Sequence, residues 1–397
     1  MTLTGNAPAP ACAGPVDDDP LEEAWRSSPN LSTLEELAGH AAQGSPGVQR
    51  KWSARLRQAG LWSLCPLLAC ARDGSLPLGR RATAAATAWD LDRDRQGRAI
   101  LRCLLPGLAP EEAGAILAQM SPEALADLEK GPFVWSVVPF FNELDLLAAR
   151  LEEMARAVDR FVIIEAPVTF RGEPKPLYYQ ENRSRFRNWS TQVDHCVVSL
   201  PDSPDPWDRE IFQRNVGREV LADLGAKGDD VVLLTDLDEI VRADKVPGIV
   251  TATETGPVIL LMSMYWYSPA WRDPVPWAHP KAFRYGQVPP CTTYHQVRHQ
   301  SLPVVADAGW HLSFFGGRAQ FDYKISSFSH SEDDTPEKHS AGYQDMIFSQ
   351  GIATHGRKLL PAHDYFPYSL RCLFHDQEPD GQAPGKADGQ LERGEGQ

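Results

Sequence analysis

The 397-residue sequence predicts an α/β fold, in which a mostly parallel sheet with helices on both faces follows a small all-helical region. Two observations predict this class. From residue 31 to residue 130, helical patterns follow one another with no strand pattern between them. After Gly131-Pro132, short apolar runs alternate with amphipathic segments. Strands that alternate with helices are typical of a parallel sheet covered by those helices.

Each apolar run is short enough for a buried strand and is bounded by polar or turn residues. The four predicted strands are "FVWSVVPFF" (133–141), "DRFVIIEA" (159–166), "QVDHCVVSL" (192–200) and "DDVVLLTDLDEI" (229–240). The segments between them that read as amphipathic helices are "LDLLAARLEEMARAV" (144–158) and "DREIFQRNVGREVLADLGA" (208–226).

Composition divides the chain into four regions. Both ends are rich in Pro, Gly and charge and poor in large apolar residues, which predicts disorder over 1–20 and 376–397. Residues 21–130 form a helical region of unknown role, and residues 131–375 form the α/β domain, where we expect the function to lie.

Charge and hydropathy exclude several classes of protein. The net charge is -14 and no cluster of Lys and Arg appears, which argues against nucleic-acid binding. Seven scattered cysteines without a CxxC pair indicate neither a zinc site nor a disulfide framework. The first residues lack the features of a secretory signal. The most apolar run, "VILLMSMYWY", has about half of the ~20 residues of a spanning helix. We therefore expect no integral membrane segment and a cytoplasmic or otherwise soluble protein.

Two aspartates separated by one leucine, Asp236-Leu237-Asp238, end the fourth predicted strand. Alternate residues of an extended backbone point to the same side, so both carboxylates can hold one divalent cation. Ligands of open α/β sheets collect at the carboxyl ends of strands, which favours a site over a solvated strand end.

Further candidates fall near other strand ends. Glu165 ends the second strand and either accepts hydrogen bonds from a nucleotide or is a surface carboxylate. Asn142 and Glu143 follow the first strand, and Asn142 is the better candidate for a helix cap. Arg214, on the helix before the fourth strand, either reaches phosphate oxygens or forms a surface salt bridge.

The later part of the chain offers a histidine, a lysine and a group of acids. His311, in "GWHLSFF", is either a core histidine or a ligand of a metal or pyrophosphate. Lys324 either neutralises phosphate or is solvated. Glu332, in the polar turn "SFSHSEDD", is our candidate general base, although it can equally cap the next helix; Asp333 and Glu239 are the next candidates. The aromatic residues of "MYWYSPAW" and Trp277 fit either a sugar platform or the core.

Several of these segments together resemble glycosyltransferase family 17, the β-1,4-mannosyl-glycoprotein 4-β-N-acetylglucosaminyltransferase-like group. The resemblance extends from about Phe133 to Pro367 and excludes the helical region. It lies in "FFNELDLLAARLEEMARAVDRFVIIEAPVTFRGEPKPLYY", "FQRN", "LLTDLDEI" and "AGWHLSFFGG", which occur in the family's order.

The resemblance implies a GT-A-like fold and assigns roles by motif. Asp236 and Asp238 match the metal-binding pair, and Glu239 matches the acid that follows it. The matches in other blocks are Glu143, Asp145, Arg150, Glu165, Thr169, Gly172, Pro174, Lys175, Pro176, Arg214 and His311. We therefore expect Asp236, Asp238 and His311 to bind the metal, and Glu143, Glu165, Lys175, Arg214 and Asp236 to bind the donor. The expected catalytic residues are Glu332, Glu239 and His311.

These assignments predict an inverting glycosyltransferase that uses Mn²⁺ or Mg²⁺. The expected donor is UDP-N-acetylglucosamine, and the expected acceptor is a hydroxyl of a glycan or glycoprotein, with a β-1,4 linkage to mannose. Eukaryotic members of the family are typically Golgi enzymes, so a Golgi location would require targeting that the sequence does not reveal. The alternatives are a metal-dependent nucleotide-sugar phosphohydrolase and a non-catalytic sugar-binding protein.

Overall fold

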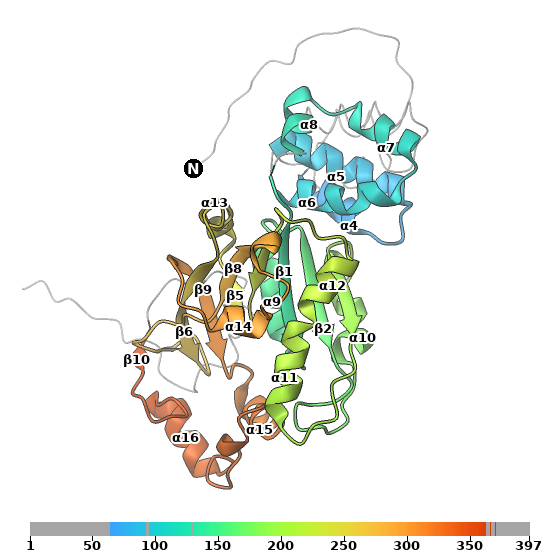
Figure 1. Cartoon of the computed structure of the whole chain (residues 1–397). Helices are drawn as coiled ribbons and strands as arrows, with labels where there is room; N and C mark the ends of the chain where they lie inside the picture. The colour runs from blue at the N-terminus through green and yellow to red at the C-terminus, as the bar shows by residue number, and fades with distance from the viewer. Residues whose placement is uncertain (1–63, 93–94, 129–130, 363–365, 367–369, 371–397) are drawn as a thin grey trace, which may run out of the picture.

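A computed structural model describes residues 64–92, 95–128, 131–362, 366 and 370 as a helical unit beside an α/β unit (Figure 1). The segments predicted to be disordered, 1–20 and 376–397, lie outside the described residues, as do residues 21–63 of the helical region. Within the described part of the chain, no helix has the length and apolar character needed to cross a membrane.

The helical unit has its own core, as its sequence predicts. The Ala-rich α5 contributes Ala82, Ala85 and Ala88 to that core, and these small side chains allow neighbouring helices to approach closely. Its α-helices are α4 (Leu64–Arg72), α5 (Leu78–Asp92), α6 (Arg95–Leu104), α7 (Pro110–Leu117) and α8 (Pro122–Leu128).

The α/β unit is built on one large sheet with a parallel half and a second half that we call antiparallel, although β6 and β9 within it are parallel to each other. The order is β10-β7-β6-β8-β4-β1-β2-β3, and β9 lies between β6 and β5. Strands β4, β1, β2 and β3 are parallel to one another, whereas β8 is antiparallel to both β4 and β6. The strands are β1 (Val134–Phe140), β2 (Arg160–Glu165), β3 (Val193–Val197), β4 (Val231–Leu234), β5 (Glu239–Val241), β6 (Val258–Trp266), β7 (Trp271–Arg272), β8 (Lys281–Arg284), β9 (Val304–Ser313) and β10 (Leu360–Pro361).

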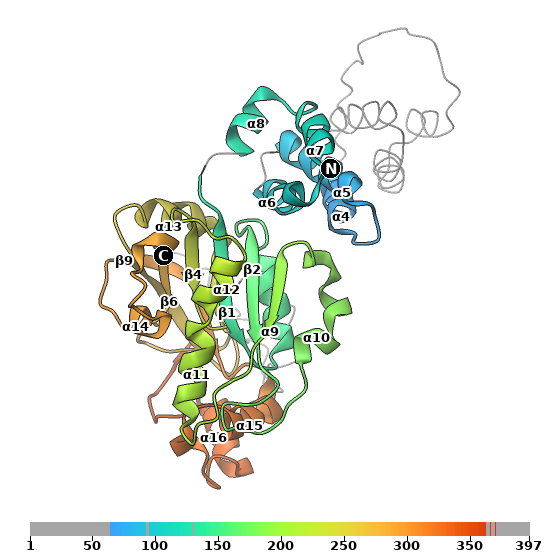
Figure 2. The same cartoon turned by 45° about the vertical axis from the view of Figure 1, so that its right-hand side comes forward.

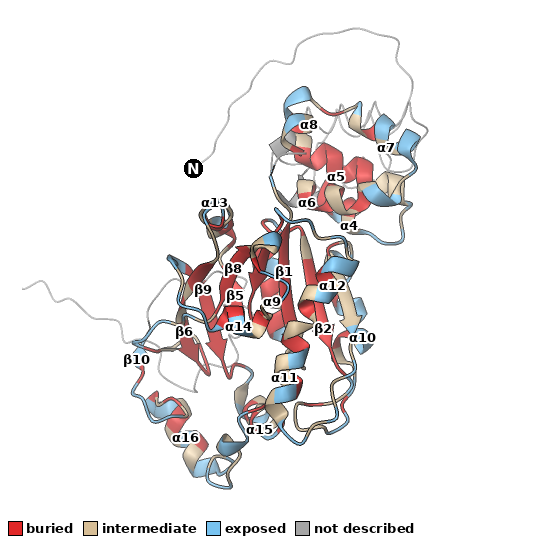
Figure 3. Cartoon of the chain, in the orientation of Figure 1, coloured by how far each residue is buried: buried red, intermediate tan, exposed pale blue. Residues whose placement is uncertain are grey.

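Both faces of β1, β2 and β4 are buried, which explains the unbroken apolar runs in their sequences (Figure 3). Val134 and Val138 of β1 join the core that contains α9, whereas Trp135 and Val137 join the core that contains α12 and α14. The predicted α/β class is therefore confirmed. The remaining α-helices are α9 (Leu144–Met154), α10 (Tyr178–Glu181), α11 (Pro206–Asn215), α12 (Gly217–Asp223), α13 (Val246–Ala252), α14 (Tyr294–Arg298), α15 (Gly317–Ser327) and α16 (Ala341–Gln350).

Two predicted elements differ in detail from the structure. The single helix predicted over 208–226 is divided into α11 and α12. The strand predicted over 229–240 ends at Leu234, and a turn precedes β5. Asp236 and Asp238 therefore lie in a turn and not in an extended strand, so their directions depend on the groups that hold the turn.

The helical unit contacts the amino end of the parallel strands. Arg102 lies 3.8 Å from the centroid of the Phe133 ring and donates a 3.4 Å hydrogen bond to Asp159 Oδ1. Asp159 Oδ2 in turn accepts from the backbone N–H of Val134, at the start of β1. Helices α15 and α16 lie at the other end of the α/β unit (Figures 1 and 2).

Candidate functional site

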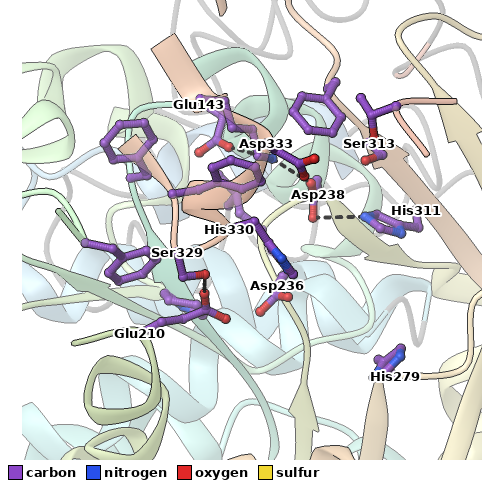
Figure 4. Close-up of a pocket in the computed structure, with 18 of the residues that line it drawn as sticks. Glu143, Glu210, Asp236, Asp238, His279, His311, Ser313, Ser329, His330 and Asp333 are labelled. Atoms are coloured by element: carbon purple, nitrogen blue, oxygen red, sulfur yellow. Dashed lines mark hydrogen bonds and ion pairs between the residues drawn. The ribbon is translucent and has the colours of Figure 1, made fainter. Parts of the chain in front are cut away.

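A cavity of about 660 Å³ opens at the carboxyl ends of β1 and β4 (Figure 4). Phe140 and Phe141 line it from the end of β1, Asp236 and Asp238 from the turn after β4, and Lys324 from α15. Some residues of the segments 168–175, 273–279, 327–333 and 354–357 also line it. The cavity thus lies where the topology of the sheet favours ligand binding.

Arg150 of α9 binds the turn formed by residues 236–239, which we call the acidic turn, from inside the protein. Its side chain is fully buried, and Nη1 donates to the carbonyl oxygens of Asp236, Leu237 and Glu239 at 3.2, 3.4 and 2.8 Å. Nη2 donates to the hydroxyls of Ser136 and Thr235. In a strand, these carbonyl groups would accept hydrogen bonds from a neighbouring strand. Here the Arg150 side chain donates to them instead.

Asp236 is held by two arginines. Its Oδ1 accepts from Arg214 Nη2 at 2.9 Å, and its Oδ2 accepts from Arg298 Nη2 at 2.5 Å. Burial alone would raise the pKa of Asp236, but Arg214 and Arg298 outweigh it and lower the pKa to about 2. Asp236 is therefore ionised and fixed in place.

Asp238 faces the cavity between a lysine and a histidine (Figure 4). Its Oδ2 accepts from Lys324 Nζ at 2.9 Å, and its Oδ1 lies 3.5 Å from His311 Nε2. Lys324 Nζ also lies 3.2 Å from Glu143 Oε1. Burial opposes charge on both groups, but Lys324 and His311 lower the pKa of Asp238, and Asp238 and Glu143 raise the pKa of Lys324. These two side chains are therefore charged where they line the cavity.

The residues that could hold a metal ion are Asp238 and His311. A separation of 3.5 Å between Oδ1 and Nε2 suits two adjacent ligands of one small cation, and Mn²⁺ or Mg²⁺ commonly takes its other ligands from substrate and water. Both oxygens of Asp236 already accept from arginines, so Asp236 is a poorer ligand here than the sequence predicts. Among the described residues, no group of three or more His, Cys, Asp or Glu side chains is arranged to hold a metal.

The charge balance around the turn also fits a cation. Six carboxylates and six basic side chains surround the turn, so a diphosphate would add excess negative charge, which a divalent cation would offset. The carboxylates are Glu143, Glu165, Glu210, Asp236, Asp238 and Glu239, and the basic residues are Arg150, Lys175, Arg214, Lys281, Arg298 and Lys324.

Glu165 and Lys175 form a buried pair at the β1 side of the cavity. Glu165 has no exposed surface and accepts from the backbone N–H of Tyr179, while its Oε2 lies 2.8 Å from His195 Nε2. Lys175 lines the cavity, and its Nζ lies 3.6 Å from Glu165 Oε1. Glu165 is therefore placed to orient Lys175, and does not itself line the cavity.

The three residues predicted to be catalytic lie in different surroundings. His311 lines the cavity. Glu239 is fully buried beneath it, where its Oε2 accepts from the backbone N–H of Asp236 and from Arg298. The side chain of Glu332 is 66% exposed, contacts His330 and does not line the cavity, whereas the adjacent Asp333 does.

Sequence reasoning missed three charged residues at the site. Arg298 and Glu210 come from α14 and α11, and Arg357 comes from a late turn. Nothing in the short segment "YHQVRHQ" marks Arg298, because its role depends on a carboxylate 62 residues earlier in the chain. Of the aromatic residues, Trp266 and Trp277 line the cavity, whereas Tyr265 belongs to the core.

Comparisons with known proteins agree with this geometry. The profile of Glycosyltransferase family 17 matches residues 126–360, which is more than half of the chain. A β-1,4-mannosyl-glycoprotein 4-β-N-acetylglucosaminyltransferase of Rattus norvegicus is 30% identical over 133 residues, 31% of this chain and 24% of the relative. The chain thus matches about a quarter of that relative's length.

Among solved structures, glucosyl-3-phosphoglycerate synthase of M. tuberculosis is 14% identical with a TM-score of 0.24. The match covers 46% of this chain and 72% of that one. This likeness is too slight to add to the argument. The family profile, by contrast, covers β1 to β9 and every segment that lines the cavity. The chain therefore belongs to glycosyltransferase family 17.

Proposed function

We propose that this glycosyltransferase transfers N-acetylglucosamine from UDP-N-acetylglucosamine to a hydroxyl of a glycan acceptor, with β-1,4 linkage to mannose. Family membership supports the reaction class, and the activity for which the rat relative is named supports the sugar and the linkage. The observation that carries the proposal is the position of Asp238, Lys324 and His311 in a cavity at the ends of the parallel strands.

The nucleoside lies at the β1 side of the cavity, and its diphosphate lies over the acidic turn. Phe141 and Phe170 offer apolar contacts at that side, and Lys175 offers a positive charge. Lys324 pairs with Asp238 and Arg214 pairs with Asp236, and because both basic residues line the cavity they attract the phosphate oxygens.

A cation that is bound by Asp238 and His311 would stabilise the negative charge that develops on the leaving diphosphate. Lys324 and Arg214 contribute to the same stabilisation from fixed positions. Arg150 and Arg298 contribute indirectly, because they keep the turn in one conformation.

Asp333 is the best placed of our candidate general bases. It lines the cavity, and its side chain is 29% exposed and paired with Lys338. Asp333 takes the proton of the acceptor hydroxyl as that oxygen forms a bond to the anomeric carbon. The bond from that carbon to the phosphate oxygen breaks, and its electron pair leaves with UDP. One displacement inverts the linkage.

A screen tests the proposal directly. The protein is incubated with individual nucleotide sugars and a mixture of mannose-terminated glycans, with and without Mn²⁺, and the glycans are analysed by mass spectrometry. We expect N-acetylglucosamine to be added only from UDP-N-acetylglucosamine, and faster with Mn²⁺. Release of free sugar without any glycan product would favour the phosphohydrolase alternative. Donor binding with neither product would favour a binding protein.

A further inference from the structure

The cavity extends past the acidic turn toward the antiparallel half of the sheet. In the register of β6 and β9, His311 pairs with Met264 and Ser313 pairs with Trp266. All four residues line the cavity. Trp266 therefore lies two residues, about 7 Å, further along the sheet than the level of His311. The cavity therefore continues along these strands beyond the level of His311, and the end at Trp266 is its far wall.

The far wall is built around an arginine that a buried carboxylate orients. Arg357 Nη1 donates to Asp273 Oδ1 at 2.9 Å. The side chain of Asp273 has no exposed surface and also accepts from the backbone N–H of Val275 at 2.9 Å and from Trp266 Nε1 at 3.1 Å. With three donors, Asp273 is satisfied, and it fixes the direction of Arg357.

Arg357 keeps donor capacity for a ligand. Its side chain is 41% exposed and lines the cavity, and Asp273 is its hydrogen-bond acceptor among the described residues. The arginine lies on a tight turn closed by a bridge between Ile352 and Lys358, with Gly356 at φ +86°. A rigid turn reduces the entropy cost of ordering the guanidinium around a ligand.

The surroundings of Arg357 combine polar and apolar groups. His355, on the same turn, contacts the Trp266 ring with centroids 5.5 Å apart and lines the cavity together with Thr354. Val275, which is 50% exposed, and Pro276 offer an apolar surface at the same end. Hydrogen-bonding groups beside a small apolar surface suit a sugar, which has hydroxyls at its edge and C–H groups on its faces.

We propose that the Arg357 subsite, formed by Asp273, Val275, Thr354, His355 and Arg357, binds the accepting sugar of a neutral glycan. This inference rests on the proposed function and assigns the residues that bind its acceptor. Arg357 donates to neighbouring hydroxyls of the ring, and the Asp273 carboxylate offsets its positive charge, so the subsite has no excess charge to select an acidic sugar. The sugar then lies between Arg357 and the acidic turn, with a hydroxyl toward the donor.

Binding of a simple probe tests this inference. Methyl α-mannopyranoside is titrated into the full-length protein in the presence of UDP and Mn²⁺, with saturation-transfer NMR as the readout. The variants are Arg357→Ala, Arg357→Gln and the control Arg318→Ala. Arg318 is a comparable surface arginine, 47% exposed and paired with Asp345, that does not line the cavity. We expect both Arg357 variants to weaken mannoside binding roughly tenfold or more, with no change for Arg318→Ala or for UDP binding.

The outcomes separate this inference from the function on which it rests. Unchanged mannoside binding in both Arg357 variants would overturn the subsite, as would a wild-type protein that binds UDP but no mannoside. Glucuronate that binds at least tenfold more tightly than the mannoside, in a manner dependent on Arg357, would overturn the neutral assignment. A wild-type protein that does not bind UDP would instead contradict the proposed function.

Discussion

Arg298 Nη2 lies 2.5 Å from Asp236 Oδ2, and Nη1 of the same guanidinium donates to Glu239 at 2.9 Å. Arg298 thus binds both ends of the acidic turn. Burial alone would lower its pKa, but the carboxylates of Asp236 and Glu239 raise it. Since Arg150 binds the carbonyl groups of the same turn, two buried arginines determine where Asp238 points.

Replacement of Arg150 is expected to destabilise the fold. Arg150→Met keeps an unbranched apolar stem but removes the donors to three carbonyls and two hydroxyls, all in a buried region. Removal of one partner from such a network costs roughly 3–5 kcal/mol, so chemical denaturation should show a loss of that order. Arg318→Met serves as the control, and a loss below 1 kcal/mol for Arg150→Met would show that the network is not needed.

Stability at low pH should depend on Asp236. Its pKa in the folded protein, about 2, lies below the ordinary value of 3.8, so the ionised carboxylate stabilises the fold above about pH 4. That contribution is lost as the pH falls from 3.8 through 2, and the shift corresponds to about 2 kcal/mol.

Asp236→Asn removes the titrating group and provides the comparison. We expect the unfolding free energy of this variant to fall less steeply than that of the wild type between about pH 4 and 2. Equal slopes in denaturant titrations would contradict the assignment of this shift to Asp236.

The neighbours Glu332 and Asp333 provide a matched pair for the general base. Asp333→Asn should retain UDP binding but lower transfer roughly a hundredfold or more, because an amide cannot take the proton. Glu332→Gln should remain near wild-type activity, since its side chain is largely exposed and does not line the cavity. The reverse order of activities in a steady-state transfer assay would restore our original choice of Glu332.

The α/β domain should fold without the helical unit. A fragment from Glu129 to Asp376 retains the described sheet and its cores, and loses contacts such as those of Arg102 with Phe133 and Asp159. We expect a cooperative thermal transition at a lower temperature than in the full chain. An insoluble fragment that residues 21–130 rescue in trans would show that the two units share one core.

The parallel half of the fold could be predicted from sequence because its signals are local. A strand such as β2, with its apolar run 161–164, and an amphipathic helix such as α9 can each be recognised from a few consecutive residues. The antiparallel half depends on pairings between distant segments, such as β8 with β4, and these have no local signal.

The acids of the site could be located from sequence, but their partners could not. Asp236 and Asp238 follow a recognisable strand, and both line the cavity. Arg298 and Lys324 reach them from helices more than 60 residues away. Glu332 and Asp333 differ by one position, and only the local turn decides that Asp333 lines the cavity.

Transfer by the Asp238→Asn variant tests the central claim most directly. The wild type, Asp238→Asn and the control Asp229→Asn, whose native side chain is 94% exposed, are incubated with UDP-N-acetylglucosamine, Mn²⁺ and a mannose-terminated glycan. Mass spectrometry then measures the product. We expect the wild type and Asp229→Asn to add one N-acetylglucosamine, and Asp238→Asn to fold cooperatively but to be at least a hundredfold slower. Full transfer by a well-folded Asp238→Asn variant would contradict the account.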